Sequence, residues 1–214
     1  MNQAERHAKI ASFVQGRLKN MAAEYPSEWH DPVYRWEHTL RVAQYGQQIA
    51  KSEAAVVEIV TAACLLHDVA HFDPLENYKD HGREGARLSR PLLAALDYND
   101  EQVDAICYAI AVHVDDKADF EHPHTLEADI LSDADNIDRF GAFRILQWCA
   151  PWMDDFGALV RNLRGRVTHL EGYLAQSPLA TPAGQELFAR QLQRQVTFFN
   201  ALIDEYDLSR MPGG

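Results

Sequence analysis

A histidine and an aspartate stand side by side at the end of the most apolar stretch of the sequence. Apolar residues fill most of positions 56–66, directly before His67 and Asp68. Such a continuous run is typical of a buried helix, so the pair is expected at the buried end of one. Burying a carboxylate is costly unless a hydrogen-bonding partner or a metal ion compensates it. The pair therefore suggests metal binding; the simpler alternative is a helix end where Asp68 caps the next turn.

Four further residues of metal-binding types are expected at helix starts, helix ends or inward faces: His38, His81, His113 and Asp135. Each alone has an ordinary explanation, such as a hydrogen-bonded core histidine. Imidazole nitrogens combined with carboxylate oxygens suit manganese, iron, nickel, cobalt or zinc, whereas magnesium favours fewer imidazoles. The six residues together predict a site for one or two divalent transition-metal ions.

The spacing of apolar side chains predicts the helices that carry these residues. His38 and Val42 lie four residues apart, so His38 shares the apolar face of its helix. The His-Asp pair ends a helix over 53–68, and His113 ends a helix over 101–113.

The next ligand-type residues open or occupy further helices. One helix begins near His81, and Pro91 within it predicts either a kink or a new helix start. Asp135 is one of four aspartates within ten residues, and an amphipathic helix places at most two of these on its buried side.

Amphipathic spacing also predicts helices at both ends of the chain, over 3–24, 153–175 and 182–206. No stretch of useful length alternates polar and apolar residues, and no Asn-Gly or Asp-Gly hairpin turn occurs. The predicted fold class is all-α.

Composition narrows the range of partners. The 214 residues carry a formal net charge of -12, which repels nucleic-acid polymers and anionic membranes. A small ligand bound through a metal ion faces no such repulsion and is therefore the expected partner. The three cysteines are widely spaced in apolar stretches, which is typical of reduced core thiols. Without a signal-like or membrane-spanning stretch, a cytoplasmic location is expected.

The order of the candidate ligands resembles the HD-domain metal-dependent phosphohydrolase superfamily. That superfamily has a histidine on one helix, a His-Asp pair ending the next, and an aspartate much later. Here these positions are taken by His38, His67, Asp68 and Asp135. The local sequence Ala134-Asp135-Asn136-Ile137 favours Asp135 over its neighbours Asp133 and Asp138.

A subset of that superfamily has two further histidines between the pair and the last aspartate, and His81 and His113 resemble them. The resemblance covers roughly residues 30–145 and implies an HD-domain-like helical bundle as the core of a single helical domain, 1–214. The carboxyl-terminal helices, over 150–207, form an extension outside the resemblance. Some relatives have a histidine where this chain has Tyr34, so that residue's role is not carried over.

The resemblance implies how the ligands divide. One ion is held by His38, His67, Asp68 and Asp135, and a second by Asp68, His81 and His113. Two ions about 3.5–4 Å apart activate a water and neutralise a phosphoryl oxygen. Asp68, as the bridging carboxylate, is therefore the most important catalytic residue. Arg41 and Lys79 are the expected phosphate-binding cations, with a solvated surface charge as the alternative for each.

The leading functional hypothesis is a metal-dependent phosphohydrolase acting on a small phosphorylated molecule, with a nucleotide as the favoured substrate. The alternatives are a di-iron oxygenase of the HD type and a non-catalytic sensor or scaffold braced by metal. The long carboxyl-terminal helices leave a homodimer open. The histidines without an assigned partner are expected to be exposed loop residues: His30, His71, His122 and His124.

Overall fold

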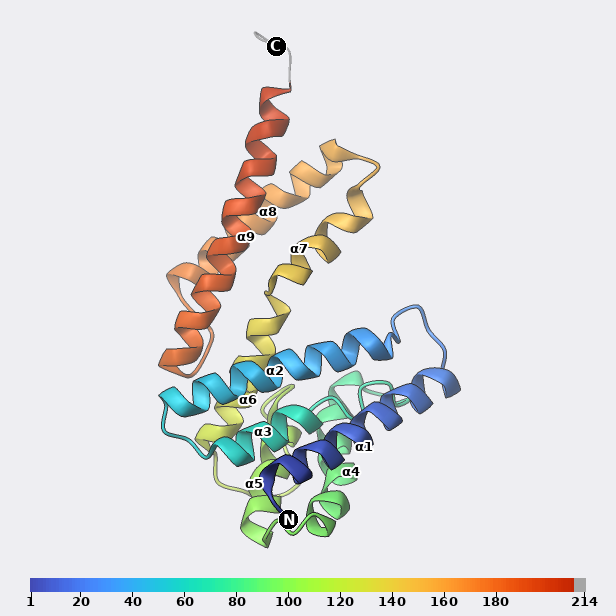
Figure 1. The fold of residues 1–214 in the computed structure, drawn as a ribbon. Coiled ribbons are helices and arrows are strands. Elements are labelled where there is room, and N and C mark those ends of the chain that lie inside the picture. Colours follow the sequence, from blue (N-terminus) through green and yellow to red (C-terminus); the bar gives the residue numbers. More distant parts are fainter. Residues whose placement is uncertain (210–214) are drawn as a thin grey trace. The chain divides into compact units, whose positions relative to one another are not determined.

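The computed structural model describes residues 1–209, which form nine α-helices and two short 3₁₀ helices and contain no β-strand (Figure 1). The all-α prediction is confirmed. The chain divides into two compact units, the first ending at Asp135 and the second beginning at Asn136. The predicted division into a core over 30–145 and an extension over 150–207 stays a prediction.

The first unit is built around one short, almost wholly buried helix. Its elements are α1 (Gln3–Glu24), α2 (Pro32–Ser52), α3 (Val57–Leu66), the 3₁₀ helix η1 (Tyr78–Asp80), α4 (His81–Ala95), α5 (Asp100–Val112) and α6 (Leu126–Arg139), whose last turn belongs to the second unit. Helix α3 contacts α1, α2, α4 and α5, and α4 packs along α5. Because α3 is covered from several directions, its carboxyl end delivers side chains into the interior of the unit.

Two local features differ from the sequence-based boundaries. The helix predicted over 53–68 begins only at Val57, because Ala54 adopts the left-handed region with φ 57° and ends the preceding turn. Helix α4 continues through Pro91, so no new helix starts there. Pro91 is exposed, which lets water satisfy the carbonyl that its missing N–H leaves without a partner.

The second unit contains α7 (Ala142–Cys149), the 3₁₀ helix η2 (Ala150–Trp152), α8 (Phe156–Ala175) and α9 (Pro182–Leu208). Helices α8 and α9 pack side by side, and α7 also contacts α9 (Figure 1). Large apolar side chains fill the space between these helices: Leu163, Leu170, Phe188, Leu192 and Phe199. None of the helices that the structure describes combines the length and apolar character needed to cross a bilayer.

Candidate metal centre

Helix α2 brings an arginine and a histidine to the interior of the first unit. Asp31 caps the helix by accepting hydrogen bonds from the N–H groups of Val33 and Tyr34, and Pro32 occupies the first turn. This start fixes the phase of the helix, and Arg35 and His38, three residues apart, lie on one face of it. The residue His38 is only 1% exposed.

The His-Asp pair directly follows α3. His67 and Asp68 are 0% and 3% exposed, as expected for the end of a core helix. The chain then turns tightly, with the N–H of His71 donating to the carbonyl of Asp68 at 3.0 Å. This turn folds the His71 side chain back onto the Asp68 carboxylate.

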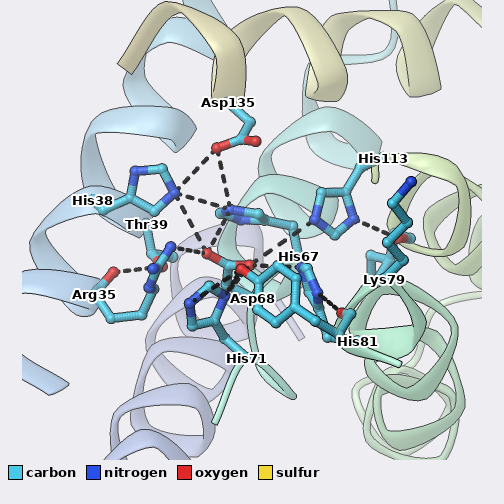
Figure 2. A network of polar contacts seen from close by, with 12 residues as sticks. Arg35, His38, Thr39, His67, Asp68, His71, Lys79, His81, His113 and Asp135 are labelled. Atoms are coloured by element: carbon cyan, nitrogen blue, oxygen red, sulfur yellow. Dashed lines mark hydrogen bonds and ion pairs between the residues drawn. The ribbon is translucent and has the colours of Figure 1, made fainter. Parts of the chain in front are cut away.

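The two carboxylate oxygens of Asp68 face two different sets of side chains (Figure 2). Three nitrogens lie near Oδ2: Arg35 Nη1 at 2.6 Å, His67 Nε2 at 3.2 Å and His38 Nε2 at 3.5 Å. Three imidazole nitrogens lie near Oδ1: His71 Nδ1 at 3.2 Å, His81 Nε2 at 3.3 Å and His113 Nε2 at 3.9 Å. We call His38, His67 and Asp135 the Oδ2 side, and His71, His81 and His113 the Oδ1 side.

Asp135, from α6, completes the Oδ2 side. Its Oδ1 atom lies 3.2 Å from His38 Nε2 and 4.0 Å from His67 Nε2, and the two Nε2 atoms are 3.3 Å apart. Ligand atoms 2.0–2.2 Å from one ion, at tetrahedral or octahedral angles, stand about 2.8–3.6 Å from each other. Most of these separations fall in that range, so the donors are spaced as the ligands of one ion would be.

Three histidine rings are oriented by backbone carbonyl groups. In each, Nδ1–H donates to the carbonyl three residues earlier: His67 to Cys64 at 2.8 Å, His81 to Tyr78 at 2.7 Å and His113 to Ile110 at 2.7 Å. This bond fixes the tautomer and leaves the Nε2 lone pair free, which is the arrangement that metal-binding histidines use. The donor set on both sides of Asp68 therefore fits divalent transition-metal ions.

Close packing of α4 on α5 brings two of these rings together. A Cβ atom at Gly82 would lie 2.8 Å from the carbonyl oxygen of Ala111 and 2.9 Å from that of Ile110, so only glycine permits this approach. Gly82 directly follows His81, and the ring centroids of His81 and His113 are 5.1 Å apart.

Burial and the charges of the cluster shift the pKa values of its histidines in different directions. Burial opposes protonation of His81, yet its hydrogen bond to Asp68 raises its pKa above the usual value. Burial opposes ionisation of Asp68, yet His67, Arg35 and His71 hold its pKa well below the usual value. Burial, together with His67 and His81, lowers the pKa of His113 to about 4. At neutral pH the site therefore holds an ionised carboxylate beside a neutral imidazole, the protonation states that metal ligation requires.

The structure brings the six predicted ligands together, with the other five grouped around Asp68. The two predicted cations lie differently: Arg41 is half-buried, with its guanidinium carbon 5.8 Å from the centroid of the Tyr34 ring, and Lys79 is exposed on η1. The roles assigned to these two residues stay predictions.

Sequence reasoning missed two members of the cluster. The expectation that His71 is an exposed loop residue is wrong, because its side chain is 11% exposed and contacts Asp68. Ligand atoms of Asp68, His71 and His81 all lie within 4.8 Å of one another. The other missed member is Arg35. Its position three residues before His38 was a usable signal, since that spacing shares a helix face.

Comparisons with known proteins agree with this geometry. A family model of the HD domain matches residues 35–139. A predicted HD superfamily hydrolase from an uncultured Thermotogales bacterium is 22% identical, with a TM-score of 0.67, covering 96% of this chain and 99% of its own. An HD-superfamily hydrolase from Bacillus thuringiensis is 18% identical, also with a TM-score of 0.67, over 96% and 99% of the two chains.

A third solved structure is Bacillus subtilis YpgQ in complex with ADP. It is 20% identical with a TM-score of 0.65, covering 100% of this chain and 98% of its own. At such identities these structures show a shared fold. A search of curated proteins found no significant match.

Proposed function

Because residues 35–139 of this chain match the family model of the HD domain, we propose that it is a metal-dependent phosphohydrolase that cleaves a phosphoester of a small phosphorylated molecule. One observation carries the proposal: the two oxygens of Asp68 face two separate sets of metal-type donors. A carboxylate so placed can bridge two ions, the arrangement used by enzymes that displace a phosphate with water.

The proposed ligand sets follow the two sides of Asp68. His38, His67, Asp68 and Asp135 would hold one ion, and Asp68, His81 and His113 the other. Bound divalent ions supply Lewis acidity toward a phosphoryl oxygen and lower the pKa of water. The protein's contribution is to keep the His113 imidazole neutral and the Asp68 carboxylate ionised, and to orient three of the histidine rings through backbone carbonyl groups.

Arg35 is proposed as a cation that faces the substrate phosphate. Its Nη1 bonds Asp68, and its buried Nε has no hydrogen-bond partner among the described residues. A buried guanidinium N–H without an acceptor is costly, and a phosphoryl oxygen would satisfy it. Arg41 and Lys79 remain proposed as additional phosphate-binding groups.

A nucleotide is the proposed substrate class. Its support is the similarity to YpgQ, whose solved structure contains ADP. The loop over 74–80 and the acidic segment over 114–124 are the proposed determinants of specificity, since they lead into His81 and follow His113.

The test combines metal analysis with a substrate panel. The metal content of protein purified without chelator is measured by elemental analysis. The metal is then removed, and the protein is reloaded with manganese, iron, cobalt, nickel or zinc. Each form is assayed for phosphate release from nucleotides and sugar phosphates. We expect about two ions per chain and metal-dependent hydrolysis that favours nucleotides. Two bound ions without phosphate release from any compound would instead favour the oxygenase or scaffold alternative. A protein that binds none of these metals is not such a hydrolase.

A further inference from the structure

One guanidinium group, that of Arg83 in α4, joins two chain segments that flank the Oδ1 side. Its Nε donates to Asp80 Oδ1 at 3.1 Å and its Nη2 to the carbonyl of Lys79 at 3.3 Å, and Nη2 also pairs with Asp80. Its Nη1 donates to Asp115 Oδ1 at 2.8 Å and to the carbonyl of Lys117 at 3.0 Å. All three nitrogens are therefore engaged, on segments more than thirty residues apart in sequence.

The first of these segments leads into His81. Lys79 and Asp80 belong to η1, and the carbonyl of Tyr78 in the same short helix holds Nδ1 of His81 at 2.7 Å. A shift of η1 would move that carbonyl and turn the ring. By bonding two residues of η1, Arg83 fixes the element that orients His81.

The second segment follows His113. Helix α5 ends at Val112, and the chain reverses at Asp116, which has φ 58° and whose N–H donates to the carbonyl of Val112 at 2.9 Å. Arg83 bonds the residues on either side of Asp116. The left-handed conformation is uncommon for a residue other than glycine and persists where surrounding contacts fix it. The turn that ends the His113 helix is thus held from α4.

The other arginines of α4 make different contacts. Arg87 pairs with Glu84 of its own helix. Arg90 lies toward the carboxyl end of α4, far in sequence from His81. Its Nη1 lies 2.6 Å from Asp104 Oδ1 in α5. The guanidinium carbon of Arg90 also lies 5.7 Å from the centroid of the Phe120 ring. Among the described residues, however, Arg90 hydrogen-bonds neither η1 nor the turn at Asp116, which makes it a matched control for the bonds of Arg83.

We infer that Arg83 is a positioning residue for the second metal position: it holds in place His81 and His113, whose Nε2 atoms lie 3.3 Å and 3.9 Å from Asp68 Oδ1. The inference rests on the proposed function, because it concerns an ion that the proposed hydrolase binds. Groups that orient metal ligands typically contribute about 10–100-fold to metal affinity. Loss of Arg83 should weaken binding on the Oδ1 side and leave the Oδ2 side unchanged.

The experiment titrates the chelator-stripped full chain with Co²⁺, followed by calorimetry and by visible absorption. Wild type is expected to show two binding events, and His113→Ala identifies which of them belongs to the Oδ1 side. In Arg83→Met that event should weaken about 10–100-fold, with its absorption band altered, while the other event keeps its affinity. Arg90→Met should retain both events.

A milder variant keeps the test valid if Arg83→Met fails to fold. Asp115→Asn keeps an acceptor oxygen but removes the charge opposite Arg83, so it should weaken the same event by a smaller factor. If Arg83→Met folds and both affinities stay within about twofold of wild type, the inference is overturned. It is also overturned if both events weaken equally, if Arg90→Met behaves the same way, or if Asp115→Asn has no effect.

The titration separates this inference from the proposed function. A wild type that binds two Co²⁺ ions, with the expected response to Arg83→Met but without hydrolysis of any phosphoester, supports the positioning role and overturns the hydrolase. A wild type that binds one ion or none overturns the inference, because no second metal position then exists.

Discussion

The two sides of Asp68 are built by different means. The Oδ2 side collects side chains from α2, the end of α3 and α6, elements far apart in sequence, and pairs two imidazoles with the Asp135 carboxylate. The Oδ1 side collects imidazoles from the turn after Asp68 and from the neighbouring helices α4 and α5. The first side thus depends on the packing of the whole core, and the second on one helix pair and the turn that follows α3.

The two sides of Asp68 also differ in the chemistry of their ligands. Two carboxylates contribute to the Oδ2 side, whereas the Oδ1 side offers imidazoles and a single carboxylate oxygen. Nitrogen-rich sites favour nickel, zinc or iron over harder ions such as manganese or magnesium. The two positions should therefore differ in metal preference, and the variants below test how independent they are.

The largest effect is expected from Asp68→Asn, since this residue serves both sides. The variant keeps the shape of the side chain but removes the charge that both ions share, so both ions should be lost. The fall in metal affinity should exceed the factor of about 10–100 that is typical when a residue supporting a ligand is removed. Elemental analysis and phosphate release measure this, and circular dichroism checks the fold. Retention of two ions would contradict the bridging role.

A matched pair of variants separates the sides. His38→Ala removes a ligand from the Oδ2 side, and His113→Ala removes one from the Oδ1 side. Each should reduce the number of bound Co²⁺ ions from two to one, because the remaining side keeps its own ligands. If either substitution abolishes both binding events, the two sides do not act as separate positions.

A smaller effect is expected from Gly82→Ala. The new methyl group would press on the carbonyl oxygens of Ala111 and Ile110, which should force α4 away from α5 and cost about 1–3 kcal/mol of stability. Urea unfolding measures this loss, and Co²⁺ titration should show weakening on the Oδ1 side only.

Gly16→Ala is the control, since nothing lies within 4 Å of the added methyl group in α1. It should stabilise the protein by about 0.5–1 kcal/mol, because alanine loses less backbone entropy in a helix. A Gly82→Ala protein as stable as wild type would show that the helix pair can adjust.

The smallest expected effect is that of Tyr78→Phe. The Tyr78 hydroxyl lies 3.1 Å from His71 Nδ1 on the partly exposed edge of the Oδ1 side. Losing one such hydrogen bond should change Co²⁺ affinity there by about two- to tenfold. The Oδ2 event in the same titration serves as the internal reference, and an equal change in both events would argue against a local role.

The sequence predicted the fold class and the six residues that meet at Asp68, because ligand types at helix ends and on apolar faces leave a local pattern. It failed where position depends on turn geometry. His71 looked like a loop histidine, since nothing local indicated that the turns after α3 fold it back onto Asp68. The contacts of Arg83 could not be predicted either, because two of its partners, Asp115 and Lys117, lie beyond the next helix.

The start of α3 was mispredicted for a similar reason. The apolar pattern around it extends smoothly, but a single left-handed residue, Ala54, ends the preceding turn, and alanine gives no signal for that conformation. Side-chain periodicity therefore located the helices, while single backbone conformations and contacts distant in sequence decided the details of the site.

The carbonyl groups that hold the three histidine rings set a rule for redesign. Cys64 and Ile110 orient His67 and His113 through backbone oxygens alone, so their side chains can be exchanged for others that fill the same space. Moving the end of either helix by one residue would rotate the ring even if every ligand were retained. Transplanting this centre into another helical scaffold therefore means copying where helices stop, with the ligand identities as the easier half of the task.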